Sequence, residues 1–364
     1  MNIGVIGGGQ LARMLALAGY PLGLKLICLE PNANCPAAEV AEVIKGDYAD
    51  PKQLQALADR VDVITYEFEN INLSALAAIT HPPIYPAINA LAVAQDRLSE
   101  KTFFNQLDIP TTQFAAINSL EELYSAARKI GLPAVLKTRR WGYDGKGQVV
   151  IHAMDELEPA WLQLQHQPLL LENKVPFQRE VSCLAVRSTL GETAFYPLVM
   201  NQHQAGILRL SQVVTEEDEV AAAARDYVGR ILNEWNYVGV LAVEFFEDKG
   251  CLFANEIAPR VHNSGHWSIE GAVSSQFENH LRAVAGLPLG ATTANGYTAM
   301  VNFIGSVPPL ATILKIQGVH CHLYGKEARP GRKLGHATIC SVDKNSYSQQ
   351  LQALCALAGF ENSV

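Results

Sequence analysis

Residues 241–257 read LAVEFFEDKGCLFANEI, two apolar segments joined by a short polar turn. The pattern predicts a β-hairpin, because Lys-Gly is a fair hairpin turn and strand-forming residues flank it. In such a hairpin Glu244 and Glu256 lie at opposite or nearly opposite positions. Two buried like charges need a shared cation, and Mg²⁺ takes one or two carboxylates together with substrate phosphate oxygens. We therefore predict a magnesium site, with Asn255 as a further candidate ligand; the alternative is that both acids pair with arginines such as Arg260.

A second polar cluster follows Lys137, which ends an apolar segment over residues 134–137. Residues 138–148 (TRRWGYDGKGQ) combine three glycines with basic side chains. The N–H groups and cations of such a loop can cover phosphates. The Walker A pattern is absent, and the alternative is an ordinary exposed turn. Beside a metal-binding hairpin, however, a phosphate-covering loop is what an ATP site requires.

The first part of the chain alternates short apolar segments with helical patterns. Strands are predicted over residues 1–6, 24–29 and 61–66, and helices over 10–19 and 51–60. Strands that alternate with helices in this way form parallel βαβ units. We therefore expect a doubly wound parallel sheet at the N-terminus.

The first turn of this region carries a glycine pattern. Gly7, Gly9 and Ala12 spell G-x-G-x-x-A between strand and helix, and Glu30 ends the next strand. This spacing is typical of an NAD site, where glycines let the backbone approach a phosphate and the acid binds a ribose. The alternatives are another ligand at the strand ends, or tight packing alone. The segment by itself leaves these interpretations open.

Changes in pattern divide the chain into three domains. An α/β domain covers residues 1–95, an α+β domain with hairpin-like strands covers 96–290, and a small β-rich domain covers 291–364. One long helix is predicted over Ile88–Leu107, across the first boundary, and another near Glu216–Trp235. The chain is therefore expected to bury more than one core.

The composition excludes several classes of protein. The 364 residues carry a formal net charge of −8, which argues against nucleic-acid binding. No apolar run approaches the roughly 18 residues that cross a bilayer, and residues 1–6 lack the basic segment and cleavage site of a signal peptide. The seven cysteines include no C-x-x-C pair, which argues against a zinc ribbon or a disulfide framework. We expect a cytoplasmic protein with free thiols and no membrane partner.

Four segments together resemble a known family. They are residues 95–101 (QDRLSEK), 142–148 (GYDGKGQ), 255–267 (NEIAPRVHNSGHW) and 329–336 (RPGRKLGH). From Gly7 to about His336 the chain resembles the ATP-grasp superfamily and, within it, the N5-carboxyaminoimidazole ribonucleotide synthetases of purine biosynthesis. The resemblance implies an ATP-grasp fold between an N-terminal doubly wound parallel-sheet domain and a small C-terminal β-rich domain. It also implies a lid subdomain at about residues 115–180, and a homodimer.

The same resemblance implies which residues bind the nucleotide. The ATP-binding residues would be Arg97, Lys137, Gly142, Tyr143, Asp144, Gly145, Lys146, Gly147, Gln148, Glu172, Asn173, Lys174, Val175, Glu180, His203, Asn255 and Glu256. Among them, Arg97 and Lys137 would contact phosphates, residues 172–175 would read adenine through the backbone, and Glu180 would accept from the ribose. Glu244 and Glu256 would hold Mg²⁺. Trp141 departs from the family pattern, which has a glycine there.

The implied second substrate is 5-aminoimidazole ribonucleotide, which is carboxylated with bicarbonate. The residues that would bind it are Gly8, Gln10, Leu11, Glu67, Lys326 and Arg332, the last two at its 5′-phosphate. Arg260 and His262 would be catalytic, because they sit where the family handles carboxyphosphate and CO₂. The alternative for His262 is a neutral imidazole that only positions its neighbours.

The implied activity is an ATP-dependent carbon–nitrogen ligation. ATP, bicarbonate and 5-aminoimidazole ribonucleotide would give N5-carboxyaminoimidazole ribonucleotide, ADP and phosphate through carboxyphosphate. One alternative is another ATP-grasp ligase, such as a formate-dependent glycinamide ribonucleotide transformylase. A different class is an NAD-dependent oxidoreductase, which leaves the glutamate hairpin and the glycine loop without a function. A non-catalytic nucleotide-binding module is disfavoured by the number of separate polar clusters.

Overall fold

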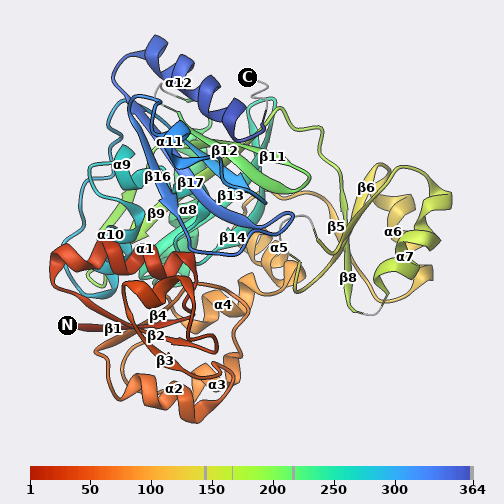
Figure 1. Ribbon diagram of the computed structural model, residues 1–364. Helices are drawn as coiled ribbons and strands as arrows, with labels where there is room; N and C mark the ends of the chain where they lie inside the picture. The colour runs from red at the N-terminus through yellow and green to blue at the C-terminus, as the bar shows by residue number, and fades with distance from the viewer. Residues whose placement is uncertain (143–145, 166, 215–217, 361–364) are drawn as a thin grey trace.

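The computed structural model describes residues 1–142, 146–165, 167–214 and 218–360. Within these residues the strands form three sheets. Figure 1 shows them as an N-terminal layer, a lid that stands to one side, and a large central sheet. The layout confirms the expected fold class, a parallel α/β layer followed by a mixed α and β region.

The N-terminal layer is a parallel four-stranded sheet in the order β3-β2-β1-β4. Its elements are β1 (Asn2–Ile6), α1 (Gln10–Gly19), β2 (Lys25–Glu30), β3 (Glu42–Lys45), α2 (Pro51–Ala58), β4 (Val63–Tyr66) and α3 (Leu73–Ala77). Leu11 and Leu15 of α1 pack on one face of the sheet, and Leu54 and Leu57 of α2 pack on the other. The sheet is therefore doubly wound, as predicted. Strand β3, which is short and partly exposed, lies outside the predicted strands.

The single long helix predicted over Ile88–Leu107 is wrong. The structure has two helices, α4 (Ile88–Ala94) and α5 (Arg97–Gln106). Between them Asp96 has an extended backbone with φ −135°, and its carboxylate accepts from the N–H groups two and three residues later at 3.0 and 3.3 Å. An aspartate in this N-cap position starts a new helix. The apolar periodicity of the sequence continues across this boundary, which is why the pattern predicts one helix.

The lid is an antiparallel four-stranded sheet in the order β5-β8-β6-β7. Its elements are β5 (Phe114–Ile117), α6 (Leu120–Ile130), β6 (Ala134–Thr138), β7 (Gln148–Ile151), α7 (Leu157–Leu164) and β8 (Leu169–Asn173). Leu123 of α6 and Leu157 of α7 form one core with Leu136 and Leu171 of the sheet. In Figure 1 both helices lie on the outer side of this unit, away from the central sheet.

The central sheet contains nine strands among the described residues. Its order is β14-β13-β9-β11-β12-β15-β17-β16, and β10 pairs with β9 off this path. The strands are β9 (Arg179–Arg187), β10 (Thr193–Phe195), β11 (Val199–Gln204), β12 (Ile207–Val213), β13 (Gly239–Asp248), β14 (Cys251–Ala258), β15 (Tyr297–Ile304), β16 (Val319–Leu323) and β17 (Lys333–Ser341). The predicted hairpin, β13 and β14, forms one edge of this sheet and packs against α5.

The C-terminal β-rich segment does not form a sheet of its own. Strand β15 pairs with β12, with Val301 opposite Leu210, so the strands after residue 290 extend the central sheet. The separate small domain expected over residues 291–364 is thus continuous with the middle domain through its sheet. The domain boundaries near residues 95 and 290 stay predictions.

Helices complete the central region. They are α8 (Ala221–Glu234), α9 (Ser268–Gly271), α10 (Gln276–Val284), α11 (Leu310–Ile313) and α12 (Lys344–Leu357). Helix α8 begins at Ala221, later than the predicted start near Glu216, and residues 215–217 lie outside the described residues. Across the part of the chain that the structure describes, no helix is long and apolar enough to span a membrane.

A buried histidine joins the N-terminal layer to the central sheet. His280 of α10 accepts at Nδ1 from the Val240 N–H at 3.1 Å, so its proton is on Nε2, which lies 2.8 Å from Thr65 Oγ1 of β4. His280 is 0% exposed, and burial lowers its pKa to about 4. The contact therefore requires the neutral imidazole.

We expect this contact to make the stability depend on pH. Because the folded pKa of about 4 lies below the unfolded value, the contribution of His280 is complete above the unfolded pKa and is lost as the pH falls towards 4. From an unfolded pKa of about 6.5, the free energy of unfolding should drop by on the order of 3 kcal/mol over this range. Urea unfolding at a series of pH values measures it. An unchanged pH slope in His280→Gln would contradict the assignment.

Candidate active site

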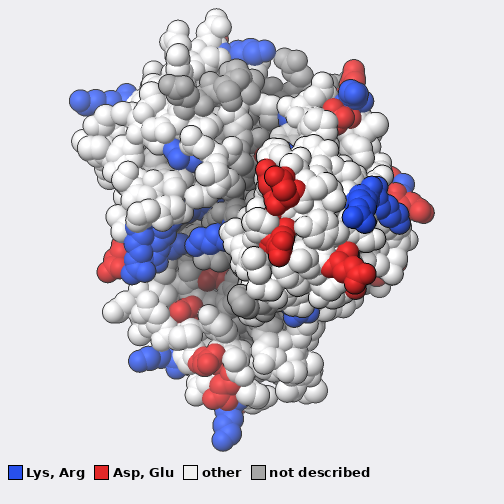
Figure 2. Space-filling model, turned by 90° about the vertical axis from the view of Figure 1, so that its right-hand side faces the viewer, with Lys and Arg blue, Asp and Glu red and all other residues white. Residues whose placement is uncertain are grey.

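A cavity of about 600 Å³ opens between the N-terminal layer, the lid and the central sheet. In the space-filling view, Lys and Arg side chains gather where the surface is hollowed beside one lobe (Figure 2). The predicted site residues that line the cavity are Gln10, Leu11, Glu67, Arg97, Lys137, Gly142, Gln148, Glu172, Asn173, Lys174, Val175, Glu180, His203, Glu244, Asn255, Glu256, Arg260 and His262. The described residues Gly8, Lys146, Gly147, Lys326 and Arg332 are not among its lining residues. Tyr143, Asp144 and Gly145 lie outside the described residues.

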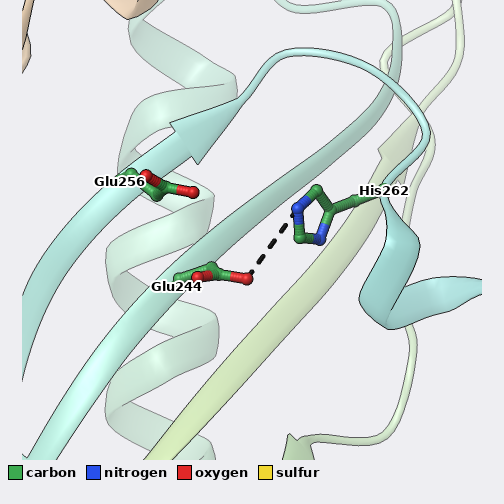
Figure 3. Close-up of side chains that lie close together, drawn as sticks. All are labelled: Glu244, Glu256 and His262. Atoms are coloured by element: carbon green, nitrogen blue, oxygen red, sulfur yellow. Dashed lines mark ion pairs between the residues drawn. The ribbon is translucent and has the colours of Figure 1, made fainter. Parts of the chain in front are cut away.

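The glutamate hairpin forms one wall of the cavity. Glu244 of β13 lies directly opposite Glu256 of β14, and the register shifts after Glu244. Figure 3 shows both carboxylates pointing from neighbouring strands towards His262, whose Nε2 lies 3.8 Å from Glu244 Oε1. Arg260 pairs with Glu69 at 2.6 Å and not with either hairpin glutamate. Arg260 therefore does not neutralise the hairpin. Arg97 Nη1, however, lies 3.7 Å from Glu256 Oε2, so one of the two acids does pair with an arginine.

The donor atoms of the hairpin suit a divalent cation. Each of Glu244, Glu256 and His262 offers one ligand atom, and these atoms lie within 4.8 Å of one another. Burial, together with the negative charge of Glu256, raises the pKa of Glu244 to about 7. The Asn255 Oδ1 atom is buried and has no hydrogen-bond partner among the described residues. A pair of oxygen donors that repel each other, beside an unpaired carbonyl oxygen, fits a hard ion such as Mg²⁺.

A histidine–glutamate pair lies on the same face of the sheet. His203 Nδ1 of β11 is hydrogen-bonded to a carboxylate oxygen of Glu180 on β9. Burial lowers the pKa of His203, but the bond to Glu180 and the charges of Glu244 and Glu256 outweigh it and raise the pKa to about 9. At neutral pH His203 is therefore a cation, set among the carboxylates of the cavity.

Lys137 is held by a buried carboxylate. Its Nζ lies 3.2 Å from Glu172 Oε1, and Lys101 Nζ lies 3.4 Å from Glu172 Oε2. Burial alone would raise the pKa of Glu172, but Lys137, Lys101 and Arg97 hold it far below its usual range. The side chain of Glu172 thus anchors Lys137, whereas the sequence resemblance implies only a backbone role for Glu172.

The backbone of the predicted hinge is mostly used by the lid. The Asn173 N–H donates to Gln113 O at 3.0 Å, and the Lys174 N–H donates to Pro133 O at 3.0 Å. Val175 follows these two residues at the cavity wall, and its N–H has no hydrogen-bond partner among the described residues. Of these three amides, only that of Val175 is left without a partner among the described residues.

The start of the glycine loop is tied to the break between α4 and α5. Arg139 donates from Nε and Nη2 to Asp96 at 3.0 and 2.7 Å, and Arg140 Nε lies 3.3 Å from the same carboxylate. Trp141 follows with φ 65°, in the left-handed region that favours glycine. A side chain there costs about 1 kcal/mol. The glycine that the sequence resemblance implies here would suit this backbone, and Trp141 adopts it at that cost.

The glycine turn before α1 is occupied by the protein's own carboxylates. Glu67 accepts from the N–H groups of Gly9 and of Ala12, the latter at 2.9 Å. Glu30, the predicted ribose ligand of an NAD site, accepts from the Gly8 N–H at 3.0 Å. A pyrophosphate would have to displace both acids from amides that bind anions. The structure therefore argues against the NAD-dependent oxidoreductase.

Of the two residues predicted to bind the phosphate of the second substrate, Lys326 reaches the N-terminal layer from the segment between β16 and β17, whereas Arg332 bonds within that segment. Lys326 Nζ donates to the side-chain oxygen of Gln10 and lies 5.6 Å from the ring centre of Tyr324, a cavity residue. Arg332 Nη1 donates to Glu327 O at 3.2 Å. Residues that are far apart in the sequence thus meet at the rim of the cavity.

The two predicted catalytic residues differ in how they are held. Arg260 donates from Nη1 to Val261 O at 2.9 Å and pairs through Nη2 with Glu69. Its buried Nε has no partner in the part of the chain that the structure describes. His262 Nδ1 lies 2.8 Å from Ser264 Oγ. Burial, helped by Arg260, lowers the pKa of His262 well below its ordinary value. His262 is therefore neutral, as the positioning alternative requires.

Some residues of the site escape reasoning from the sequence. Glu100 is buried, accepts from the Ile257 N–H at 2.5 Å and lines the cavity. Burial and the charge of Glu256 raise its pKa to about 8. Lys101 and Glu69 complete this group. For Glu100 and Lys101, the only signal in the sequence is their place in the QDRLSEK segment, because buried charges carry no local pattern.

Models of three protein families match this chain. They are described as the ribonucleotide synthetase preATP-grasp domain (residues 1–95), the ATP-grasp domain (102–277) and the phosphoribosylaminoimidazole carboxylase C-terminal domain (298–350). A curated relative, the N5-carboxyaminoimidazole ribonucleotide synthase of Pseudomonas aeruginosa, is 53% identical over 98% of this chain and 99% of its own.

Solved structures agree with these matches. The N5-carboxyaminoimidazole ribonucleotide synthetase of Thermus thermophilus has a TM-score of 0.94 and 48% identity, and the match covers 100% of this chain and 99% of that one. The N5-carboxyaminoimidazole synthase of Aspergillus clavatus, solved with ADP and 5-aminoimidazole ribonucleotide, has a TM-score of 0.91 and 28% identity over 98% of both chains. The fold, the family models and the 53% identity over nearly the whole chain together place this chain in the N5-carboxyaminoimidazole ribonucleotide synthase family, within the ATP-grasp proteins.

Proposed function

We propose that this protein is an ATP-dependent carbon–nitrogen ligase of purine biosynthesis. It carboxylates 5-aminoimidazole ribonucleotide with bicarbonate to N5-carboxyaminoimidazole ribonucleotide, and releases ADP and phosphate. The observation that carries the proposal is the pair Glu244 and Glu256, opposed on one hairpin in the same cavity as Lys137 and Arg260. That cavity combines a nucleotide site with a second set of polar groups, as a ligation between two substrates requires.

The nucleotide half of the site is built from the hairpin and the lid. Lys137 and Arg97 would neutralise the ATP phosphates, and Val175 would read the base from the hinge. Mg²⁺, held by Glu244 and Glu256 with Asn255 beside them, would supply charge neutralisation at the transferred phosphoryl group. His203, positively charged next to Glu180, would balance the acids of this wall.

The carboxylation half lies around Arg260. Bicarbonate is a poor electrophile, and transfer of the ATP phosphoryl group converts it to carboxyphosphate. Arg260 Nε, a buried donor with no partner within the described residues, would be available to that oxyanion. His262, neutral and bonded to Ser264, would orient these groups. Burial of this wall would keep water from the reactive intermediate.

The ribonucleotide would bind between the N-terminal layer and the central sheet. The residues proposed to contact it are Gly8, Gln10, Leu11, Glu67, Lys326 and Arg332. The bond between Lys326 and Gln10 supports this placement, because it joins the two sides of the rim. A phosphate monoester suits the cations there. We also propose a homodimer in the cytoplasm, without nucleic-acid or membrane partners.

ADP release tests the function. We expect full rate only with ATP, bicarbonate and 5-aminoimidazole ribonucleotide together, because the ligation consumes all three. Formation of ADP is followed by a coupled assay while each substrate is omitted in turn. Indifference to the ribonucleotide would count against the proposal. Full rate with formate and glycinamide ribonucleotide would favour the transformylase alternative instead.

A further inference from the structure

A buried row of three charges lies behind the phosphate wall of the cavity. Glu172 Oε1 lies 3.2 Å from Lys137 Nζ, and Glu172 Oε2 lies 3.4 Å from Lys101 Nζ. The side chains of Lys101 and Glu172 are 0% and 2% exposed. One carboxylate from β8 is therefore shared by two ammonium groups, one from α5 and one from β6.

The row connects the lid to the metal hairpin. Lys101 Nζ also donates to Ala254 O of β14 at 2.9 Å, two residues before Glu256. Thr112 Oγ1 donates to Glu172 Oε2 at 2.9 Å. The side chain of Lys101 thus bonds to both the carboxylate behind Lys137 and the strand that carries Glu256.

The charge of the row depends on its second lysine. A Glu172–Lys137 pair alone would be neutral, and the ammonium of Lys137 would be balanced before any ligand arrived. With Lys101 present, two cations share one carboxylate, and the row keeps one net positive charge in a site of low dielectric. Such a charge attracts an anion much more strongly than it would in water.

We propose that Lys101 is a positioning residue for the nucleotide: by sharing Glu172 and holding Ala254, it leaves the charge of Lys137 available to a bound phosphate and aligns the lid with the hairpin. The inference rests on the proposed function, because it takes Lys137 as a phosphate ligand. Lys101 itself is not one of the cavity-lining residues. It acts through Glu172 and the backbone.

The charge arrangement predicts that removing Lys101 and removing the charge of Glu172 shift the pKa of Lys137 in opposite directions. The charged groups that face Lys137 are Glu172 of β8 and both Arg97 and Lys101 of α5. Burial lowers the pKa of Lys137, Glu172 raises it, and the two α5 cations lower it further, so that the net shift is downward. Removing Lys101 should therefore raise the pKa of Lys137, and removing the charge of Glu172 should lower it.

Calorimetric titration with Mg-ADP from about pH 7 to 10.5 tests the proposal. Lys101→Met is expected to weaken ADP binding about tenfold or more at neutral pH, because the row becomes neutral. The pH at which Lys101→Met loses affinity for ADP should be higher than in the unmodified protein. In Glu172→Gln that pH should be lower. Lys101→Arg should restore most of the affinity, and Lys129→Met, at an exposed lysine of α6, should match the unmodified protein.

Two results would overturn the inference. One is an ADP affinity of Lys101→Met within twofold of the unmodified protein. The other is a shift in the same direction, for Lys101→Met and Glu172→Gln, of the pH at which ADP affinity is lost. If Lys101 had only a structural role, both variants would bind ADP more weakly, but the pH at which they lose affinity would not shift in opposite directions. If Lys101→Met does not fold, the shift in Glu172→Gln decides alone, and an upward or absent shift overturns the proposal. Failure of the unmodified protein to bind ADP would instead remove the proposed function on which the inference rests.

Discussion

Replacing Glu256 with glutamine is expected to lower turnover by about 10³-fold, the largest effect of any single change considered. The substitution keeps the size and shape of the side chain but removes one of the two carboxylates that oppose each other across β13 and β14. A neutral amide oxygen binds Mg²⁺ more weakly than a carboxylate. The transferred phosphoryl group would then lose its charge neutralisation, while the fold around the hairpin is retained.

The dependence of ADP formation on Mg²⁺ concentration checks this prediction. The variant should need far more Mg²⁺ than the unmodified protein, and its maximum rate should stay low. Asp248→Asn is a matched control, since this acid lies at the tip of the same hairpin and does not line the cavity. It should be nearly normal. Near-normal turnover by Glu256→Gln would remove the metal assignment.

The hairpin could be predicted from the sequence because its determinants are local. A Lys-Gly turn between two strand-forming segments sets the pairing, and the structure places Glu244 directly opposite Glu256. The turn residues Lys249 and Gly250 have φ values of 51° and 75°, the backbone that such a turn demands. The same local logic gives the first βαβ unit, where helix α1 has the predicted bounds.

The rest of the site depends on contacts between distant residues. Lys101 and Glu172 are far apart in the sequence, and a lone lysine in a helix is normally interpreted as a surface residue. Glu67 is predicted to face a substrate, and it lines the cavity, but the sequence gives no sign that its two oxygens also accept from the N–H groups of Gly9 and Ala12. Such pairings are decided by how sheets and helices pack, which no local pattern encodes. The break at Asp96 was hidden for another reason, since apolar periodicity runs through it.

Replacing Arg260 with lysine is expected to lower carboxylation about 10²-fold while leaving the affinity for ADP within about twofold. Arg260 uses Nη2 for Glu69 and Nη1 for Val261 O, which fixes the guanidinium. Its Nε is left as a buried donor that no described residue pairs with. Lysine keeps the positive charge, but a single ammonium cannot reproduce this fork. It would stay with Glu69, and the donor proposed for the oxyanion would be missing.

The ratio of products separates this role from a general loss of activity. If Arg260 holds carboxyphosphate for attack by the amine, the variant should still cleave ATP but should fix less labelled bicarbonate per ADP released, because the intermediate is hydrolysed instead. A residue that only supported Glu69 would lower both quantities together. Arg60→Lys serves as a control, because its side chain is 44% exposed and its partner is Glu42 on the surface. An unchanged ratio of carboxylated product to ADP in Arg260→Lys would show that the unpaired Nε does not hold the reactive group.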